Sequence, residues 1–357
     1  MRAVTVTPGT QRSALLRDVP TPTPQGGEVL VKLIDVGLDG TDAEIDEGLY
    51  GEAPPGDDYL IIGHESLGRV EQVGPGVQGL TPGDLVVATV RRPGGCLNCQ
   101  AGENDMCLDG DYTECGIKGR HGFMADYYTE VPAYLVPIPP AFKPFAVLLE
   151  PLTIVEKGIA QSFEIQKRMR WEPKRALILG AGTIGLFAAL VLRNQGLEVT
   201  VVGREDPDVP SLKFDMLKTV GAHYRSSVID PIAELPHKLG NIDLIIEATG
   251  SSQVVFDAMR ILGINGILCL MGITGGDRTL SVPSDRINLG MVLGNKTVFG
   301  SVNANRRYFE LGVRHVGELE QRWPGLLSRF ITRRLSLEAF REGMESRRDH
   351  IKVVLEV

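Results

Sequence analysis

A run of apolar residues that leads into three glycines constrains this chain more than any other stretch. Residues 176–179 read Ala-Leu-Ile-Leu, three glycines follow in the spacing G-x-G-x-x-G, and residues 183–194 continue as an apolar helix. A strand, glycine loop and helix in this order cradle the pyrophosphate of a dinucleotide, because the glycines permit a tight turn and close backbone approach. The helix N-terminus adds unpaired N–H groups. The stretch therefore predicts a dinucleotide site formed by Gly180, Ala181, Gly182, Thr183, Ile184 and Gly185.

A membrane span is the alternative interpretation of this stretch, because residues 176–192 carry no charge. These 17 residues lie at the short limit for a span and include three glycines. Arg175 and Arg193 flank them. We therefore favour the strand and helix.

The remaining pattern predicts an α/β protein of two domains. After about residue 151, strands alternate with helices, which is typical of a doubly wound parallel sheet. The expected strands are 176–179, 199–202, 242–247, 266–270 and 297–302, and the expected helices are 151–170, 183–194, 211–220 and 253–262. Residues 1–150 alternate short apolar runs with Gly/Pro/Asp turns, which predicts a β-rich, barrel-like domain. We expect residues 305–357, with a helix at 337–344 and a last strand at 351–357, to complete that first domain, and 151–304 to form the second.

Composition excludes several classes of partner. The 357 residues carry 37 Lys and Arg against 45 Asp and Glu, a net charge of −8, which argues against nucleic acid or an anionic membrane as the main partner. The N-terminus reads as a strand and not as a signal peptide, so we expect a cytoplasmic protein. Four of the five cysteines lie within residues 96–115, which without an export signal favours metal over disulfides.

His64 and Glu65 follow the apolar residues 60–62. Alone, such a pair usually lies on the protein surface and has no functional role. Here Asp39 lies upstream, and Glu150 ends an apolar run before Pro151. Zinc takes imidazole nitrogen and carboxylate oxygen in a tetrahedral set that leaves one position open for catalysis. The alternative for Asp39 is an Asx turn beside the following glycine.

The order of these features resembles the zinc-dependent medium-chain dehydrogenases, and within them the glucose 1-dehydrogenases known mainly from archaea. The resemblance covers essentially the whole chain. It rests on residues 39–42, 63–65, 90–93, 114–117, 121–124, 149–152, 156–157 and 300–303. It implies a GroES-like barrel as the catalytic domain, a Rossmann domain, and a homodimer or homotetramer.

The resemblance also implies roles for individual residues. Asp39 and His64 would bind a catalytic zinc, Glu65 would bind it directly or through water, and Glu150 would touch metal and sugar. Thr41, Glu114 and Asn303 would hold sugar hydroxyls. Further cofactor contacts would come from Gly272, Ser301, Val302 and Asn303. Most of the superfamily has Cys in place of Asp39, so we expect a more exchangeable metal here.

The cysteine cluster reads Cys96-x-x-Cys99-x7-Cys107-x7-Cys115. Four thiolates suit a closed, structural zinc. The lobe of the resembling family usually reads Cys-x-x-Cys-x-x-Cys-x7-Cys, and its first cysteine falls on Pro93, which cannot bind metal. We therefore expect Cys115 as the replacement, with an empty or three-cysteine lobe as the alternative. Cys269 is expected to be a buried apolar filler.

Cofactor choice depends on the end of the second strand of the later domain, where Gly203, Arg204 and Glu205 follow one another. An acid here normally binds the ribose 2′-OH of NAD, whereas a basic residue accommodates the 2′-phosphate of NADP. Arg204 favours NADP, and Glu205 leaves NAD open. The alternative is that Arg204 is a solvated loop charge.

These patterns predict NAD(P)-dependent, zinc-assisted oxidation of an aldose, glucose first, at C1 to the lactone. The proton would leave through the network around Thr41 and Glu65. One alternative is a polyol or alcohol dehydrogenase. The other is a metal-free NADPH-binding protein, quinone-reductase-like or structural, and the candidate zinc ligands argue against it.

Overall fold

The computed structural model describes residues 1–357, which divide into two compact units. The first comprises Met1–Thr153, Asn303–Val316 and Leu327–Val357, and the second Ile154–Val302 and Gly317–Leu326. Helices α3 (Leu149–Gln166) and α9 (Arg306–Arg322) each pass from one unit to the other. Residues 317–326, which the sequence pattern groups with the first domain, thus group with the second unit.

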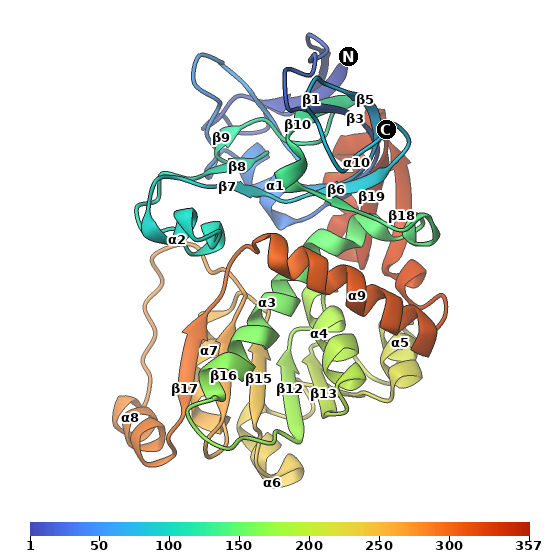
Figure 1. Ribbon diagram of the computed structural model, residues 1–357. Coiled ribbons are helices and arrows are strands. Elements are labelled where there is room, and N and C mark those ends of the chain that lie inside the picture. Colours follow the sequence, from blue (N-terminus) through green and yellow to red (C-terminus); the bar gives the residue numbers. More distant parts are fainter. The chain divides into compact units, whose positions relative to one another are not determined.

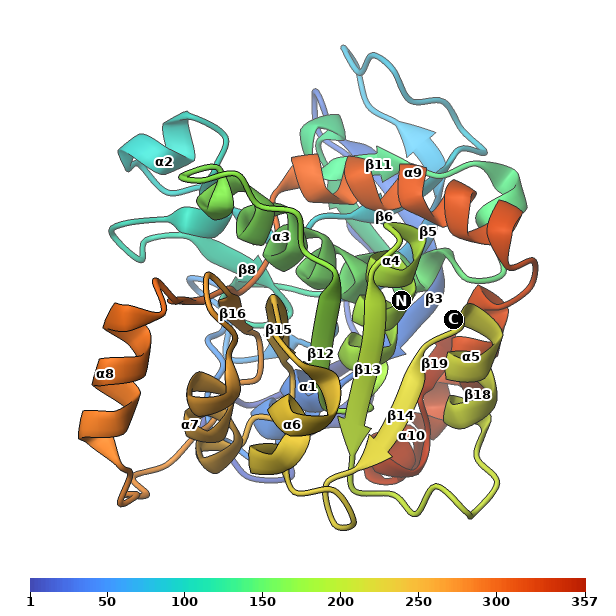
Figure 2. The same ribbon diagram turned by 90° about the horizontal axis from the view of Figure 1, so that it is seen from below.

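The second unit contains a six-stranded parallel sheet in the order β14-β13-β12-β15-β16-β17 (Figures 1 and 2). Its strands are β12 (Arg175–Leu179), β13 (Glu198–Gly203), β14 (His223–Ser226), β15 (Leu244–Glu247), β16 (Ile267–Leu270) and β17 (Thr297–Gly300). Strand order reverses beside β12, the switch point at which open α/β sheets bind dinucleotides. The predicted doubly wound sheet is therefore confirmed.

Helices cover both faces of this sheet. Alternate residues of β12 point to opposite faces, so that Ile178 contacts α4 whereas Leu177 and Leu179 join a core cluster with α6 and α7. The helices that lie wholly within this unit are α4 (Thr183–Asn194), α5 (Leu212–Val220), α6 (Leu235–Leu239), α7 (Ser252–Ile261) and α8 (Ser284–Leu293). Residues 176–192 form a strand, a loop and most of a helix, and none of the helices in the structure is both long and apolar enough to cross a bilayer.

The first unit is β-rich. Its largest sheet has the order β11-β6-β5-β3-β19-β18, with β10 also paired to β3, and two three-stranded sheets have the orders β2-β1-β4 and β7-β8-β9. The strands are β1 (Arg2–Val6), β2 (Leu15–Asp18), β3 (Val29–Leu38), β4 (Leu60–Ile61), β5 (Glu65–Val73), β6 (Leu85–Ala88), β7 (Arg91–Arg92), β8 (Thr113–Cys115), β9 (Gly119–Arg120), β10 (Tyr127–Glu130), β11 (Leu135–Pro137), β18 (Ile331–Ser336) and β19 (Lys352–Glu356). The short helices are α1 (Gly40–Asp46), α2 (Leu97–Gln100) and α10 (Phe340–Ser346).

Strand β3 is the centre of this unit. It pairs antiparallel with β5 on one side and with β19, from the end of the chain, on the other (Figure 1). Alternate residues of β3, including Val31 and Leu33, enter the barrel core. The carboxyl end of β3 leads directly into Asp39 and α1, so the strand fixes where that helix begins.

Candidate active site and metal centres

Asp39 is the N-cap of helix α1. Its Oδ1 accepts the backbone N–H of Thr41 at 2.8 Å. The Asp42 carboxylate in turn accepts the backbone N–H of Asp39 at 3.1 Å, which completes a capping box. The Asx-type turn that was the alternative interpretation of Asp39 is thus present, yet the turn occupies mainly Oδ1. Oδ2 receives the Thr41 hydroxyl at 3.3 Å and lies 3.5 Å from His64 Nε2. Capping and ligation are therefore compatible in the same carboxylate.

Glu65 is the first residue of β5 and His64 immediately precedes it, and both are buried. Gly63, with φ +90°, makes the turn that aims them, and a Cβ there would strike Met124. One ligand atom each from Asp39, His64 and Glu65 lies within 4.8 Å of the others. The structure thus brings together three of the four predicted ligands of the catalytic metal. The fourth, Glu150, is buried at the start of α3, near enough for its ionisation to depend on the charges of the other three.

Lys352, which the sequence patterns did not single out, lies against Glu65. Its Nζ is 2.5 Å from Glu65 Oε1, and both side chains are buried. Lys352 is the first residue of β19 and Glu356 is the last, and nothing in the local sequence signalled that this lysine belongs to the site. Glu65 Oε2 and His64 Nδ1 remain buried without a hydrogen-bond partner. Buried unpaired polar atoms are costly, so these two atoms mark a place where a further group belongs.

The charges in this cluster shift one another's ionisation. Burial raises the pKa of Glu150 to about 8, although the charge of His64 opposes the shift. Burial, together with the charge of Asp39, raises the pKa of Asp42 to about 7. Burial would lower the pKa of His64, but Asp39 outweighs it and raises that pKa well above the usual value. Several buried acids thus surround one imidazole. Keeping them together costs free energy, and a bound cation would lower that cost.

These residues fit a zinc ion. The donor set is one imidazole nitrogen and carboxylate oxygens, the combination found at catalytic zinc sites. The unpartnered Glu65 Oε2 supplies an acceptor with nothing else to bind.

Glu114 and Asn303 meet although 189 residues separate them. Asn303 Nδ2 donates to Glu114 Oε1 at 2.9 Å, and the Arg91 guanidinium donates to the same oxygen at 2.9 and 3.0 Å. All three side chains are buried. Asn303 has φ +58°, a conformation uncommon for residues other than glycine and often found at functional sites. Arg91 thus positions the Glu114 carboxylate. It lies within residues 90–93, which carry the family resemblance, but the sequence assigned it no role.

The three glycines of the loop after β12 have separate roles. Gly180 has φ +113°, which makes the tight turn. A Cβ on Gly185 would lie 1.9 Å from Gly180 O, so only glycine permits this close packing of α4 on the strand. A Cβ on Gly182 would meet nothing within 4 Å. The space above Gly182 and the N-terminus of α4 is therefore open to a ligand phosphate.

The residues after β13 bear on cofactor choice. Gly203 packs against Tyr224, whose hydroxyl a Cβ at 203 would approach to 2.6 Å. Arg204 is exposed and makes no hydrogen bond or ion pair in the structure. Glu205 pairs with Lys213 of α5 at 2.5 Å, a neighbour that the sequence interpretation did not consider. The charge of Glu205, the acid that argued for NAD, is thus offset by Lys213. Arg204 remains available to contact a cofactor.

Three other predicted cofactor residues lie at the carboxyl ends of β16 and β17. A Cβ on Gly272 would approach Gly250 N to 2.3 Å, so that loop also needs glycine. The Ser301 hydroxyl is buried without a partner, and Val302 is half exposed. The Val302 carbonyl accepts from the buried Lys157 at 2.9 Å.

The cysteine lobe differs from the expectation. Cys96, Cys99 and Cys107 have their sulfur atoms within 4.8 Å of one another, but Cys115 is not part of this group. Cys115 lies in β8, 1% exposed, and packs in the barrel core. The structure therefore does not bring Cys115 to the other three cysteines of the predicted site, because the inward face of β8 takes its side chain away from the loop. Cys269 is fully buried in β16, as expected.

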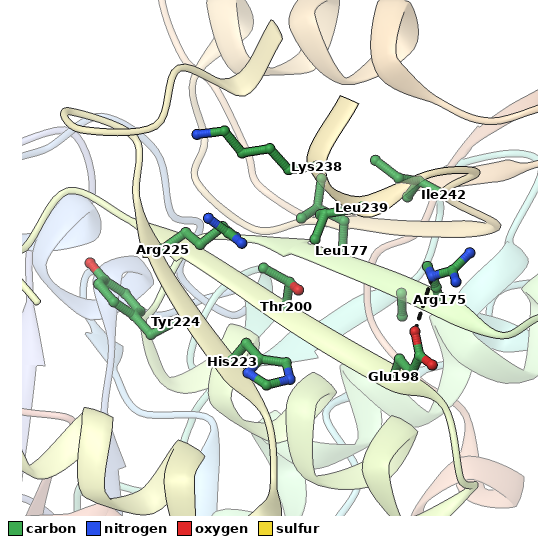
Figure 3. Close-up of a pocket in the computed structure, with 11 residues that line it drawn as sticks. Arg175, Leu177, Glu198, Thr200, His223, Tyr224, Arg225, Lys238, Leu239 and Ile242 are labelled. Carbon is green, nitrogen blue, oxygen red and sulfur yellow. Dashed lines mark hydrogen bonds and ion pairs between the residues drawn. The ribbon is translucent and has the colours of Figure 1, made fainter. Parts of the chain in front are cut away.

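A hollow of about 550 Å³ in the second unit lies away from all of these residues (Figure 3). Arg175, Glu198 and His223 line it at the amino ends of β12, β13 and β14. Arg175 is paired with Glu198 at 3.0 Å, the dashed contact in Figure 3. Dinucleotides bind at the opposite, carboxyl ends of such strands, so this volume is not the cofactor site.

Known proteins share both halves of this arrangement. Residues 25–140 match the family described as alcohol dehydrogenase GroES-like domain, and residues 143–357 match the glucose dehydrogenase C-terminus. The glucose 1-dehydrogenase of Methanocella arvoryzae is 49% identical over 359 residues, covering 100% of this chain and 99% of that protein. Glucose 1-dehydrogenase 1 of Caldivirga maquilingensis is 46% identical over 362 residues, with coverage of 100% and 99%.

A solved structure agrees with these relatives. That of Haloferax mediterranei glucose dehydrogenase in complex with NADP, Zn and gluconolactone matches with a TM-score of 0.91 and 33% identity, covering 100% of this chain and 99% of that chain. The resemblance inferred from the sequence is thus confirmed. The chain belongs to the glucose 1-dehydrogenase family of the zinc-dependent medium-chain dehydrogenases.

Proposed function

We propose that this protein oxidises D-glucose at C1 to the lactone and passes the hydride to NADP. The observation that carries the proposal is the convergence of Asp39, His64 and Glu65, with buried oxygen and nitrogen atoms that lack partners. The relatives named glucose 1-dehydrogenase and the gluconolactone named in the Haloferax structure support the substrate.

The residues of the candidate active site have separate roles in metal binding and proton transfer. Asp39 and His64 hold the metal, Glu65 binds it directly or through water, and Glu150 contacts metal and sugar. A zinc ion bound there supplies Lewis acidity to the C1 hydroxyl, and bound NADP supplies the hydride acceptor. The Thr41 hydroxyl, which donates to Asp39 Oδ2, offers the proton of the C1 hydroxyl a path into the carboxylate network.

Sugar recognition falls to Glu114 and Asn303. Arg91 and Asn303 both donate to Glu114 Oε1, which orients the carboxylate. A carboxylate and an amide held in this way pair several hydroxyls at once. A site built to pair hydroxyls rejects analogues that lack them by roughly 10⁴-fold in good cases.

The preference for NADP rests on the second unit. Gly180, Ala181, Gly182, Thr183, Ile184 and Gly185 receive the pyrophosphate at the N-terminus of α4. Arg204 pairs the 2′-phosphate, while Lys213 offsets Glu205. NAD, which lacks that phosphate, binds more weakly.

We further propose a cytoplasmic homodimer or homotetramer. Strand β17 is an edge strand, and Leu289, Val292 and Leu293 of the neighbouring α8 are 59%, 65% and 73% exposed. An open edge beside exposed apolar side chains is typical of a surface that pairs with another copy. Sedimentation of the wild type and of Leu293→Glu measures the oligomeric state. A monomeric wild type would contradict the proposed oligomer.

A substrate panel tests the function. The zinc-loaded protein is assayed with glucose, galactose, xylose, sorbitol and ethanol, each with NADP and NAD. We expect kcat/KM to be highest for glucose with NADP. His64→Ala, folded by circular dichroism, should lose the catalytic zinc and with it several kcal/mol of transition-state stabilisation, on the order of 10²–10⁴-fold in rate. Higher kcat/KM for sorbitol or ethanol, or normal turnover by His64→Ala, would overturn the proposal.

A further inference from the structure

Lys157 is a buried charge to which the proposed reaction assigns no role. It lies in α3, and its side chain is 0% exposed. Lysine is almost never fully buried unless its charge is compensated, because taking an ammonium out of water is costly. The family resemblance includes residues 156–157 but gave Lys157 no function. A charge kept in the interior at this cost indicates a specific contact that needs it.

The Lys157 ammonium binds a backbone carbonyl far along the chain. Its Nζ donates to the carbonyl oxygen of Val302 at 2.9 Å, across 145 residues of sequence. Val302 lies between β17 and α9, where residues 301–305 form no helix or strand. Its side chain is 52% exposed, so packing of the valine does little to fix this connection. The lysine therefore holds the backbone at a point that regular structure and side-chain packing leave free to move.

The carbonyl of Val302 belongs to the peptide bond that leads into Asn303. A peptide unit is planar, so fixing its oxygen also fixes the direction in which the next residue begins. Asn303 has φ +58°, a left-handed conformation that residues other than glycine keep only where their surroundings determine it. The hydrogen bond from Lys157 is part of those surroundings. Because its donor is charged, this bond is about twice as strong as one between neutral groups.

The backbone conformation of Asn303 determines where its amide points. Asn303 Oδ1 accepts the N–H of Ala304 at 2.8 Å, and Nδ2 donates to Glu114 Oε1 at 2.9 Å. A rotation of the preceding peptide unit would turn the side chain away from Glu114 and break this arrangement. The amide that is proposed to pair sugar hydroxyls is thus held by Ala304, by Glu114 and, through the backbone, by Lys157.

We propose that Lys157 is a positioning residue for sugar recognition, which holds the Val302 carbonyl so that the amide of Asn303 meets both Glu114 and the substrate. This role rests on the proposed function, since it belongs to the same sugar site. Because its side chain is fully buried, Lys157 acts through the backbone and not by touching the sugar. Loss of the ammonium should therefore weaken sugar recognition without removing any group that binds sugar or metal.

A double-mutant cycle tests this role. The kcat/KM for glucose is measured for the full-length wild type, Lys157→Met, Asn303→Gly and the double variant. Methionine keeps the apolar stem but cannot donate, and glycine adopts a positive φ without strain. We expect Lys157→Met to lower kcat/KM roughly ten- to a hundred-fold, the worth of a charged hydrogen bond. In the Asn303→Gly background the same substitution should change kcat/KM little, because the amide that Lys157 positions is absent.

Sugar selectivity separates positioning from a structural role. A loosened core would lower kcat/KM for every sugar by the same factor. Displacement of Asn303 should instead change the ratios of glucose to galactose and to xylose in the direction in which Asn303→Gly changes them. Cys269→Ala is the control, since Cys269 Sγ lies beside α3, 2.9 Å from a Cβ built on Gly158, and it should keep the wild-type ratios. Thermal unfolding is followed for each variant.

Equal losses from Lys157→Met in both backgrounds, an unchanged kcat/KM, or the same factor for all three sugars would overturn the role of Lys157. If Lys157→Met does not fold, Lys157→Gln, which keeps a neutral donor, is carried through the same cycle. It should show a smaller loss with the same dependence on Asn303. A wild type that oxidises no sugar contradicts the proposed function itself, whereas an active wild type with an unaffected Lys157→Met contradicts only the positioning role.

Discussion

Gly37 and Glu65 face one another across strands β3 and β5, and a Cβ on Gly37 would lie 1.9 Å from Glu65 Oε2. The same Cβ would also crowd Lys352. The missing side chain at position 37 therefore makes room for the buried carboxylate and its ammonium partner. The candidate metal site depends on this glycine although glycine offers no ligand.

Gly37→Ala should displace Glu65 and lower zinc retention at the catalytic site. Overpacking of this kind costs about 1–3 kcal/mol of unfolding free energy. Gly40→Ala is the matched control, since a Cβ there meets nothing within 4 Å. Thermal unfolding and zinc content after dialysis check both variants. Equal behaviour of the two would show that the space beside Glu65 is not limiting.

Lys352→Met should destabilise the metal-free protein more than the zinc-loaded protein. Removing one partner of a buried ion pair costs about 3–5 kcal/mol, because the other charge is left uncompensated. Bound zinc would compensate Glu65 in place of the ammonium. Urea unfolding with and without zinc measures the difference. The double variant Lys352→Met/Glu65→Gln should recover part of the loss, and equal losses in both metal states would argue against a metal beside Glu65.

Two glycines of the loop after β12 should respond differently to alanine. Gly185→Ala places a methyl group 1.9 Å from Gly180 O and should lower the thermal stability. Gly182→Ala meets no protein atom, and its φ of −84° suits alanine, so the fold should survive while KM for the cofactor rises. Unfolding curves and cofactor titrations separate the two effects. Unchanged cofactor binding by Gly182→Ala would place the pyrophosphate elsewhere.

Glu114→Gln should weaken hexose oxidation by about 1–3 kcal/mol in kcat/KM, since a charged hydrogen bond is lost. The substitution keeps the size of the side chain but weakens its bonds from Arg91 and Asn303. Exposed Glu71→Gln is the control. Kinetics with glucose, galactose and xylose provide the measurement. Identical kcat/KM values for every sugar would remove Glu114 from the site.

Arg204→Ala should raise KM for NADP roughly ten- to a hundred-fold while changing KM for NAD little, because a charged hydrogen bond is worth about 1.5–3 kcal/mol. Lys213→Met should act in the same direction by leaving the charge of Glu205 unpaired. Lys218→Met, on the exposed face of the same helix, is the control. Steady-state kinetics with both cofactors provide the test. Equal changes in the two KM values for Arg204→Ala would make Arg204 a loop charge.

The sequence predicted the second unit best where its strands are buried on both faces. Such strands read as unbroken apolar runs, and the predicted helix at 183–194 coincides with α4. Strand β14 was not predicted, because it is a short edge strand, His-Tyr-Arg-Ser, without an apolar run. Helix α9 was missed although it buries Tyr308, Phe309, Val316 and Leu319, because its many charges mask a single apolar face.

The site was predictable to the extent that its residues stand in local motifs. Asp39, His64 and Glu65 could be found because each follows a strand or a turn signal. Lys352 belongs to the site only because β19 pairs with β3, which no local pattern reveals. Cys115 was misplaced for the opposite reason: spacing along the chain suggested a ligand, but the alternation of β8 turns its side chain into the core.

The pairing of β19 with β3 also sets an order of events during synthesis. Lys352 is made 287 residues after Glu65, which at roughly 5–20 residues per second is a delay of roughly 15–60 s. During that time the strands of the second unit can assemble, while residues 35–38 of β3 remain unpaired on the edge that β19 will occupy. A nascent chain interrupted before β19 would thus carry a Glu65 without its ammonium partner and a partly open strand edge, which can pair with another chain and aggregate.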